Sequence, residues 1–421
     1  MVLIYLMRTI SLMTQAQTDL PFEKENPEPR KLSSSQAETN SVDRRPTAAS
    51  HSIVDQHKGR LASLDAFRGL TIALMIVVNS PGDAGNVFAP LSHADWNGWT
   101  FADTVFPSFL FIVGVSLVYS FAKQQEGSVV LRILRRTIIL FALGLFVNTF
   151  PTFDLSTIRI PGVLQRIALC YFFASLIVLR AGLRGRILWL IGLLASYWLM
   201  MRFIPVPGVG AGVLEPGQNF AAWVDSHLLK GYMWSYYDGA WDPEGIASTI
   251  PAIATTLFGV LTGQWLRSSF SDRRKVAGMV CAGLVLLIAG YVLDRWLPIN
   301  KSIWTSTFSI FMAGLALVCL AFLYWSIDMA GFPRWPKPII ILGLNPISVY
   351  VLSIVLDTIL RSMNLAVSSG NEIDCRFYLF RICHVPTTES EIASLIYALV
   401  ILMAMFFVAW IMWRKRIFIR I

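Results

Sequence analysis

A histidine stands among acids and amides just before an apolar run, in the stretch LSHADWNGWTFADTVFPSFLFIVG at residues 91–114. Near neutral pH the imidazole of His93 can accept a proton and return it, as acyl transfer to an amine or a hydroxyl requires. A lone histidine near a membrane can also be a structural residue whose ring bonds to nearby carbonyl groups. Of the five histidines, only His93 has several polar neighbours at the boundary of an apolar run. We therefore take His93 as the candidate catalytic base.

A second stretch, RLASLDAFRGLTIALMIVVN at residues 60–79, has charged residues near its start and an amide at its end. Asp65 and Arg68 are three residues apart, so one turn of a helix would pair them at the membrane surface. The side chain of Asn79 could cap the end of that helix. Its amide could also donate a hydrogen bond to a thioester or tetrahedral oxygen, which makes Asn79 the second catalytic candidate.

A third stretch, RIPGVLQRIALCY, places Arg159 before an apolar run and Gln165 and Arg166 inside it. A charge at that depth is costly, so an intramembrane arginine usually faces a polar cavity or a partner. A long arginine side chain can instead reach the membrane interface. We retain these three residues as candidate substrate contacts.

Two later stretches add polar candidates. The long loop before residue 245 ends in YYDGAWDPE and combines acids with Trp and Tyr. Such aromatic residues commonly form an interfacial belt. Together with Asp238, Asp242 and Glu244 they could also line a sugar site by stacking and hydrogen bonding. The stretch LGLNPISVYV contains Asn345 before Pro346, and a proline inside a span frees backbone groups that need new partners.

Composition predicts the elements that must position these residues. Of the 421 residues, 55% are hydrophobic and only 14% are charged, whereas soluble domains have about 25% charged residues. Apolar runs near the roughly 20 residues that cross a bilayer predict an all-α, polytopic integral membrane protein with about ten transmembrane helices. The predicted spans are Phe67–Asn79, Phe101–Ala122, Ile133–Phe150, Gly162–Leu179, Ile187–Ile204, Ile246–Leu266, Val276–Leu297, Ile303–Ile327, Ile339–Arg361 and Ile392–Trp413.

Topology explains the net charge of +9 better than a nucleic-acid surface does. Lys and Arg fall on alternate loops, whereas a nucleic-acid groove would cluster them with aromatic residues on one surface. By the positive-inside rule both termini are cytoplasmic, and a bacterial protein of this kind would lie in the inner membrane. The loop Ser80–Thr100 has no Lys or Arg, so His93 is predicted to face the non-cytoplasmic side.

We expect two regions, a disordered cytoplasmic tail at residues 1–60 and a transmembrane domain at residues 61–421. The tail is rich in Ser, Thr, Gln and Pro and cannot bury enough apolar surface to fold. Its short apolar start contains Arg8, which supports neither a signal peptide nor an anchor. Cys375 and Cys383 share a predicted outer loop, where they could form a disulfide or remain free thiols. No cysteine spacing is typical of a structural metal site, and none is predicted.

Six stretches, in order, resemble the transmembrane acyltransferases typified by heparan-alpha-glucosaminide N-acetyltransferase and its bacterial relatives. They are SLDAFRGLTIALMIVVN, HADWNGWTFADTVFPSFLFIVG, RIPGVLQRIALCY, DPEGIASTIPAIATTLFGVLTG, NKSIWTSTFSIFMAGLA and LGLNPISVYV. The resemblance covers residues 61–413. It implies acetyl-coenzyme A as the donor substrate, no permanently bound cofactor, and an amine on a glucosamine-type sugar as the acceptor. The family's active-site histidine falls on His93, and the asparagine that closes its preceding helix falls on Asn79.

A wider group of membrane acyltransferases resembles only the first of these stretches. That group has a histidine where this chain has Asn79, and the difference strengthens the assignment of catalysis to His93. The loop between Asn79 and His93 is somewhat longer than in the family. This length difference leaves the acceptor open between an amino sugar and another glycan group.

These patterns predict a membrane enzyme that binds acyl-coenzyme A at the basic inner side and transfers the acyl group outward, directly or through an acylated His93. The alternative is a transporter or flippase with a proton relay through His93, Asp95 and Asp103, but the two halves of the chain show no convincing repeat. A structural scaffold would not need the buried Arg and His. The protein could act as a homodimer in the lipid bilayer. The residues expected to contact donor or acceptor are Asp65, Arg68, Asp95, Trp96, Asn97, Asp103, Arg159, Gln165, Arg166, Asp242, Glu244 and Asn345.

Overall fold

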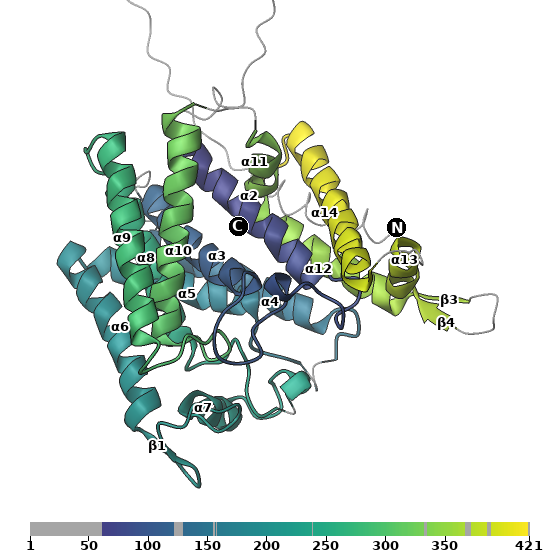
Figure 1. Cartoon of the computed structure of the whole chain (residues 1–421), viewed down its shortest axis with the longest axis horizontal. Helices are drawn as coiled ribbons and strands as arrows, with labels where there is room; N and C mark the ends of the chain where they lie inside the picture. The colour runs from purple at the N-terminus through teal and green to yellow at the C-terminus, as the bar shows by residue number, and fades with distance from the viewer. Residues whose placement is uncertain are drawn as a thin grey trace, which may run out of the picture. The chain divides into compact units, whose positions relative to one another are not determined.

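Where it is described, the chain is mostly helical (Figure 1). The computed structural model describes residues 61–121, 129–154, 156, 158–237, 239–331, 335–366, 372–384 and 389–419. The predicted tail at residues 1–60 and the candidate Asp238 lie outside the described residues.

Each of the ten predicted spans overlaps a helix or a pair of consecutive helices. These helices are α2 (Ala62–Asn79), α3 (Val105–Phe121), α4 (Val129–Thr149), α5 (Val163–Arg180), α6 (Leu183–Phe203), α8 (Thr249–Leu266), α9 (Asp272–Leu293), α10 (Ser306–Leu323), α11 (Lys337–Leu344) with α12 (Pro346–Ser362), and α14 (Ser390–Arg414). Between them lie the short elements η2 (Ala89–Leu91), η3 (Ala102–Thr104), α7 (Phe220–Leu228), η5 (Ser235–Tyr237), the π-helix η6 (Tyr324–Met329) and α13 (Cys375–Cys383). Two small antiparallel hairpins complete the described elements, β1 (Pro205–Val206) with β2 (Gly210–Ala211), and β3 (Asn364–Ala366) with β4 (Glu372–Asp374).

The helices confirm an all-α polytopic membrane protein, with fewer qualifying spans than the ten predicted. Within the described residues seven helices are long and apolar enough to cross a membrane, and the pair α11 and α12, bent by 82°, would be an eighth. The two that do not qualify are α4, whose first turns carry Arg132, Arg135 and Arg136, and α8. In α8 the polar side chains of Thr255 and Thr256 are buried against other helices, so this helix does not need a lipid-like surface.

Glycines let the central helices approach closely. A methyl group on Gly114 of α3 would lie 1.9 Å from the carbonyl oxygen of Thr256 in α8, and one on Gly259 of α8 would lie 1.9 Å from that of Phe111. The same relation joins α2 to α11, because a methyl group on Gly69 would lie 1.7 Å from the carbonyl oxygen of Ile339. Small residues at such crossings are typical of helix packing in membranes.

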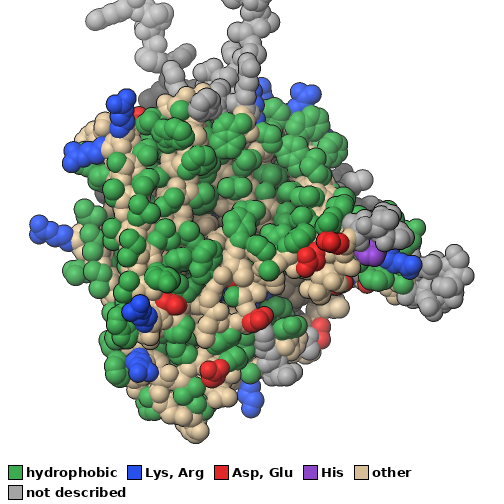
Figure 2. Space-filling view, viewed as in Figure 1, with side chains coloured by type: hydrophobic (Ala, Val, Ile, Leu, Met, Phe, Trp, Pro, Cys, Tyr) green, Lys and Arg blue, Asp and Glu red, His purple; other side chains and the backbone are tan. Residues whose placement is uncertain are grey.

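The outer helices present apolar side chains away from this core. On α9 the exposed large hydrophobic residues include Leu284, Val285 and Ile288, and on α6 they include Leu188 and Ile191. In Figure 2, hydrophobic side chains cover most of the face that is shown. An exposed apolar surface of this extent would be unstable in water and fits the hydrocarbon core of a bilayer.

The disulfide considered for Cys375 and Cys383 is not formed, because all five cysteines are free thiols. The two residues begin and end the helix α13. At about 1.5 Å of rise per residue their Cα atoms are about 12 Å apart along the axis, whereas a disulfide needs Cα atoms within about 7 Å. Both cysteines lie in the connection between α12 and α14, as predicted, but the segment that joins them is helical.

Candidate active site

His93, Asp103 and Lys301 form a cluster of ionisable side chains at the beginning of α3. The Nδ1 atom of His93 lies 2.8 Å from Oδ1 of Asp103, and the Nζ atom of Lys301 lies 3.3 Å from the same oxygen. Lys301 Nζ is also 2.9 Å from Nδ1 and 3.2 Å from Nε2 of the imidazole. The His93 side chain is 48% exposed, whereas that of Asp103 is 1% exposed. The imidazole is therefore the member of this cluster that another molecule can reach most easily.

Asp103 also fixes the loop that carries His93. The backbone N–H groups of Ala94 and Thr100 donate to its Oδ2 at 3.1 and 3.0 Å. The Thr100 hydroxyl lies 3.1 Å from the same oxygen and 2.6 Å from the carbonyl oxygen of Ser92. A buried carboxylate is costly without such partners. These contacts tie the segment from Ser92 to Thr100 to one carboxylate and hold the imidazole beside it.

The His93 loop also packs on the segment before α10. The N–H of Gly98 donates to the carbonyl oxygen of Ile299 at 2.7 Å, and the side chain of Asn300 donates to that of Asn97 at 3.2 Å. Gly98 has a φ of +96°, a conformation that favours glycine. Trp96 donates from Nε1 to the carbonyl oxygen of Leu214 at 3.0 Å. Trp96 and Asn97, which we expected to contact a substrate, thus hold the loop in place.

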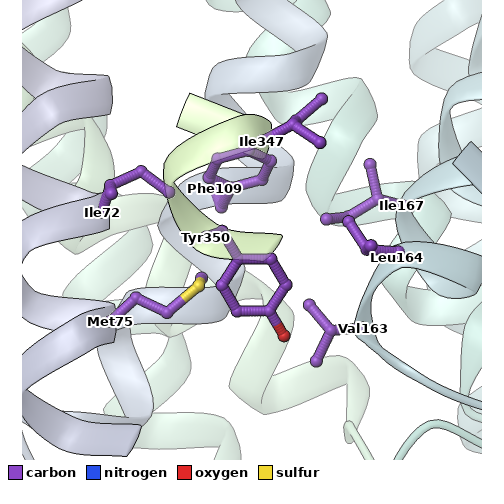
Figure 3. Close-up of a pocket in the computed structure, with 8 residues that line it drawn as sticks. All are labelled: Ile72, Met75, Phe109, Val163, Leu164, Ile167, Ile347 and Tyr350. Atoms are coloured by element: carbon purple, nitrogen blue, oxygen red, sulfur yellow. The ribbon is translucent and has the colours of Figure 1, made fainter. Parts of the chain in front are cut away.

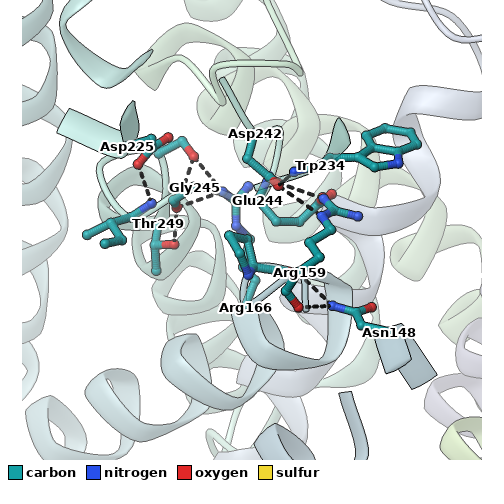
Figure 4. Close-up of polar contacts among 12 residues, drawn as sticks. Asn148, Arg159, Arg166, Asp225, Trp234, Asp242, Glu244, Gly245 and Thr249 are labelled. Carbon is teal, nitrogen blue, oxygen red and sulfur yellow. Dashed lines mark hydrogen bonds and ion pairs between the residues drawn. The ribbon is translucent and has the colours of Figure 1, made fainter. Parts of the chain in front are cut away.

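A second cluster joins Arg159 to two acids of the loop before α8 (Figure 4). Arg159 donates to both carboxylate oxygens of Asp242, at 2.9 and 2.6 Å, and to Glu244 at 2.5 Å. Its guanidinium also lies 4.9 Å from the ring centre of Trp234. Burial alone would lower the pKa of Arg159, but the hydrogen bonds and charges of the two acids outweigh it and raise this pKa. The sequence placed Arg159 in one stretch and the two acids in another, and the fold brings them together.

Arg166 lies next to this cluster and is almost fully buried, with 1% of the residue exposed. Its Nη2 donates to the carbonyl oxygen of Gly245 at 3.1 Å and to the hydroxyl of Ser248. Its Nε and Nη1 atoms have no hydrogen-bond partner among the described residues. The guanidinium lies 5.1 Å from the ring centre of Trp304. Arg166 therefore faces a buried polar site, as expected for an intramembrane arginine that does not reach the interface.

Asp225 of α7 completes the buried charge around Arg166. It accepts a hydrogen bond from the N–H of Ile246 at 2.8 Å and is 1% exposed. Burial raises the pKa of Asp225 to about 6, although this hydrogen bond and the charge of Arg166 oppose the rise. A methyl group on Gly245 would lie 1.7 Å from an Asp225 oxygen, so this position excludes larger residues.

The charge of Glu244 couples the two clusters electrostatically. The Glu244 carboxylate acts on Lys301 of the first cluster, on Arg166, and on the hydroxyl of Tyr350. Burial lowers the pKa of Lys301, while the Asp103 and Glu244 carboxylates oppose this effect. Figure 3 shows that Tyr350 also borders an apolar cavity between α2, α3, α5 and α12. The cavity is lined by Ile72, Met75, Phe109, Val163, Leu164, Ile167, Ile347 and Tyr350.

Three predicted site residues lie far from His93. Asp65 pairs with Arg68 at 2.6 Å, as their spacing predicted, and Arg68 also donates to the hydroxyl of Ser116. The helical rise from Asp103 to Ser116 is about 20 Å, so this pair is at the other end of α3. Asn345 bonds to the backbone of Ile417 and Ile419, at 3.0 and 2.9 Å.

The structure thus does not bring these residues into the His93 cluster. The Asn345 amide holds the C-terminal segment at the bend between α11 and α12.

Three other candidates are placed differently again. Asn79 is the exposed last residue of α2, and its amide makes no hydrogen bond with the described residues. Asp95 is exposed and has no ion pair within the part of the chain that the structure describes. Gln165 is buried between α4 and α5, where a methyl group on Gly144 would lie 2.2 Å from its Oε1. Gln165 therefore fills helix packing space, and Asp95 does not join His93 and Asp103.

Lys301 and Asp225 were missed as site residues by the sequence analysis. Lys301 belongs to the quoted stretch NKSIWTSTFSIFMAGLA, where it looked like an ordinary loop cation beside a span. A signal was present, because the positive-inside rule expects few cations in an outer loop. For Asp225 no signal of comparable strength exists in a loop with several acids.

No group of three or more His, Cys, Asp and Glu side chains among the described residues is arranged to hold a metal ion.

The family model for the catalytic region of heparan-alpha-glucosaminide N-acetyltransferase matches residues 60–289. The chain is 31% identical over 352 residues to heparan-alpha-glucosaminide N-acetyltransferase of Homo sapiens. The aligned region covers 69% of this chain and 52% of that protein. It is 30% identical over 353 residues to the Mus musculus protein of the same name. This second aligned region covers 69% of this chain and 53% of that protein. The chain therefore spans about half the length of the curated relatives that it matches.

Proposed function

The chain belongs to the heparan-alpha-glucosaminide N-acetyltransferase family, and on this premise we propose that it is a membrane-embedded acyltransferase. It moves an acetyl or related acyl group from acyl-coenzyme A to an amino sugar or another glycan acceptor. The observation that carries the proposal is the contact of His93 with the buried carboxylate of Asp103 at 2.8 Å. An imidazole oriented in this way, and open to outside molecules, has the geometry of a general base.

In the direct mechanism Nδ1–H of His93 donates to Asp103, and Nε2 takes the proton of the attacking amine. Asn79 polarises the thioester carbonyl from the end of α2. In the covalent mechanism Nε2 attacks the thioester first, and the acceptor then removes the acyl group from the imidazole. Both mechanisms use the same residues in the same positions, and both remain part of the proposal.

The acceptor is proposed to bind near the outer loop. Trp234 and Tyr236 stack at 5.3 Å between ring centres, and both side chains are exposed. Aromatic faces of this kind suit the apolar faces of sugar rings. The neighbouring Glu244 is partly exposed at 11% and can accept hydrogen bonds from sugar hydroxyl or ammonium groups. Arg159 and Asp242 bond to each other and support this surface from behind.

The donor is proposed to bind from the opposite, cytoplasmic side. The alternation of basic and basic-poor loops supports two cytoplasmic termini and an outer position for His93. Loop cations could meet the phosphates of coenzyme A there. A bacterial protein of this family would lie in the inner membrane. The transporter alternative is not favoured, because Asp95 is not in contact with the other members of its relay.

Release of coenzyme A distinguishes the enzyme from the transporter. Purified protein in proteoliposomes, given acetyl-coenzyme A, is expected to release free thiol only when an amino sugar or glycan acceptor is added. A thiol reagent measures this release, and empty liposomes give the background. Absence of release with every acceptor tested, together with protein-dependent uptake of a sugar, would establish transport instead.

A further inference from the structure

Lys301 occupies an unusual position against the imidazole of His93. Its Nζ lies at nearly equal distances, 2.9 and 3.2 Å, from the two ring nitrogens. The two nitrogens are separated by a single carbon, so an atom placed in this way is not in line with either lone pair. Its third contact, 3.3 Å to Asp103, is an ion pair. Lys301 therefore acts on the imidazole mainly through its charge, while its ammonium group pairs with Asp103.

The fold builds this position for Lys301 from local contacts. The carbonyl oxygen of Lys301 accepts a hydrogen bond from the N–H of Trp304 at 3.0 Å, and the N–H of Ile303 donates to Asn300 at 3.1 Å. Trp304 is 1% exposed, and its Nε1 lies 3.3 Å from the hydroxyl of Thr255. The Lys301 side chain itself is 19% exposed. Its ammonium group is thus held by a buried turn and is not a freely moving surface cation.

The charges that face His93 act in opposite directions. Asp103, from η3, favours the imidazolium form of His93, because an opposite charge stabilises the protonated ring. Lys301, from the loop before α10, disfavours the imidazolium, because a like charge destabilises it. The Glu244 carboxylate opposes the lowering of the Lys301 pKa by burial and so helps to keep Lys301 charged. Lys301 therefore opposes the effect of Asp103 on the imidazolium.

We propose that Lys301 is a positioning residue that counterbalances Asp103, so that His93 both accepts the proton of the acceptor and gives it up within one turnover. The inference rests on the proposed acyltransferase function. In the direct reaction the amine nitrogen bonds to the thioester carbon as its proton moves to Nε2 of His93. The carbon–sulfur bond then breaks, its electron pair goes to sulfur, and the proton on Nε2 moves to that thiolate. No oxidant or other reactant is required.

The test follows the protonation of His93 without using acyl transfer. Diethyl pyrocarbonate reacts with neutral imidazole, and peptide mass spectrometry reports the modification of His93 as a function of pH. Lys301→Met is expected to raise the midpoint of this curve by about one pH unit or more, because Asp103 then acts unopposed. Lys301→Arg, which keeps the charge, is expected to stay near the wild-type midpoint. Lys230→Met removes an exposed cation that makes no ion pair in the described residues and serves as the matched control.

The pH dependence of kcat/KM measures the same effect of Lys301 on His93. The acid limb of the kcat/KM profile is expected to move to higher pH in Lys301→Met and to remain in place in Lys230→Met. A double variant, Lys301→Met with Asp103→Asn, removes both charges and is expected to return the modification midpoint toward the wild-type value. If Lys301→Met folds poorly, Lys301→Gln provides the same loss of charge with a polar side chain.

The outcomes separate this inference from the function on which it rests. An unchanged midpoint in well-folded Lys301→Met and Lys301→Gln would overturn the role of Lys301. Equal shifts in Lys301→Arg and Lys301→Met would also overturn it, because size and not charge would then be responsible. A shifted midpoint in a protein that releases no coenzyme A would support the effect of Lys301 on His93 and refute the acyltransferase function.

Discussion

His93→Ala is expected to lower kcat by roughly 100-fold or more while leaving folding and donor binding intact. The His93 side chain is about half exposed and fills no core space, so its removal has little effect on packing. The loop keeps its other contacts, since Asp103 still accepts from the N–H groups of Ala94 and Thr100. Loss of the group that accepts the proton should therefore appear in the chemical step. Steady-state kinetics with acetyl-coenzyme A and an amino sugar, alongside donor binding by calorimetry, measure both quantities.

His227→Ala is the matched control for this prediction. His227 is another exposed histidine, on α7, whose ring stacks on Trp223 at 4.5 Å between centres. It has no contact with Asp103 or Lys301 in the described residues, so kcat should stay within about two-fold of the wild type. If His93→Ala, purified at normal yield and still binding donor, retained near-wild-type kcat, both the direct and the covalent mechanisms would be wrong.

Arg159→Met is expected to destabilise the folded protein by about 3–5 kcal/mol, because it leaves a carboxylate buried without its cation. The Asp242 side chain is 0% exposed and makes two hydrogen bonds to Arg159. Backbone N–H groups of Trp234 and Glu244 also donate to Asp242, at 3.0 and 2.9 Å, but they carry no net charge. Thermal unfolding in detergent, followed by tryptophan fluorescence, measures the loss.

A double variant shows whether the buried charge causes this loss. Asp242→Asn removes the carboxylate charge, so combining it with Arg159→Met is expected to restore a large part of the stability. Arg202→Met provides a comparison at an exposed arginine in the last turn of α6. An Arg159→Met protein that unfolds at the wild-type temperature would show that the ion pair contributes nothing measurable. The proposed support of the acceptor surface would then lose its basis.

Much of the helical framework could be predicted because membrane spans follow directly from long apolar runs. Each predicted span overlaps a helix. Pro346 indicated the bend at Asn345, because a proline cannot continue the backbone hydrogen bonding of α11. The pairing of Asp65 with Arg68 also followed from helical spacing alone. Fewer spans qualify than predicted because α4 carries three arginines in its first turns and α8 buries polar threonines against other helices.

The candidate site was harder to predict, because its contacts join residues that are far apart in the sequence. The stretch around His93 contains both Asp95 and Asp103, and spacing alone does not say which carboxylate meets the imidazole. The fold selects Asp103 because η3 turns that residue inward, whereas Asp95 remains exposed. Lys301 reaches the cluster only because the loop before α10 packs on Gly98. Such loop packing leaves no periodic pattern in the sequence.

Some residues that we expected to bind substrate meet in one cluster, whereas others bond to distant parts of the chain. Arg159 meets Asp242 and Glu244 in one cluster, although it comes from a different loop than the two acids. Asn345 instead bonds to the segment after α14, which no sequence pattern linked to it. A polar residue inside a span signals a need for partners, but the fold decides whether these belong to a substrate or to the chain itself.

The central claim is that the acyl group passes from a donor on the cytoplasmic side to an acceptor on the outer side through the site at His93. Inside-out membrane vesicles test it most directly, with an amino sugar trapped inside and acetyl-labelled acetyl-coenzyme A added outside. Mass spectrometry of the trapped sugar is expected to show labelled N-acetyl groups with the wild-type protein and none with His93→Ala. The claim would be contradicted if the wild-type protein left the trapped sugar unlabelled. Exit of this unmodified sugar from the vesicles would identify a transporter.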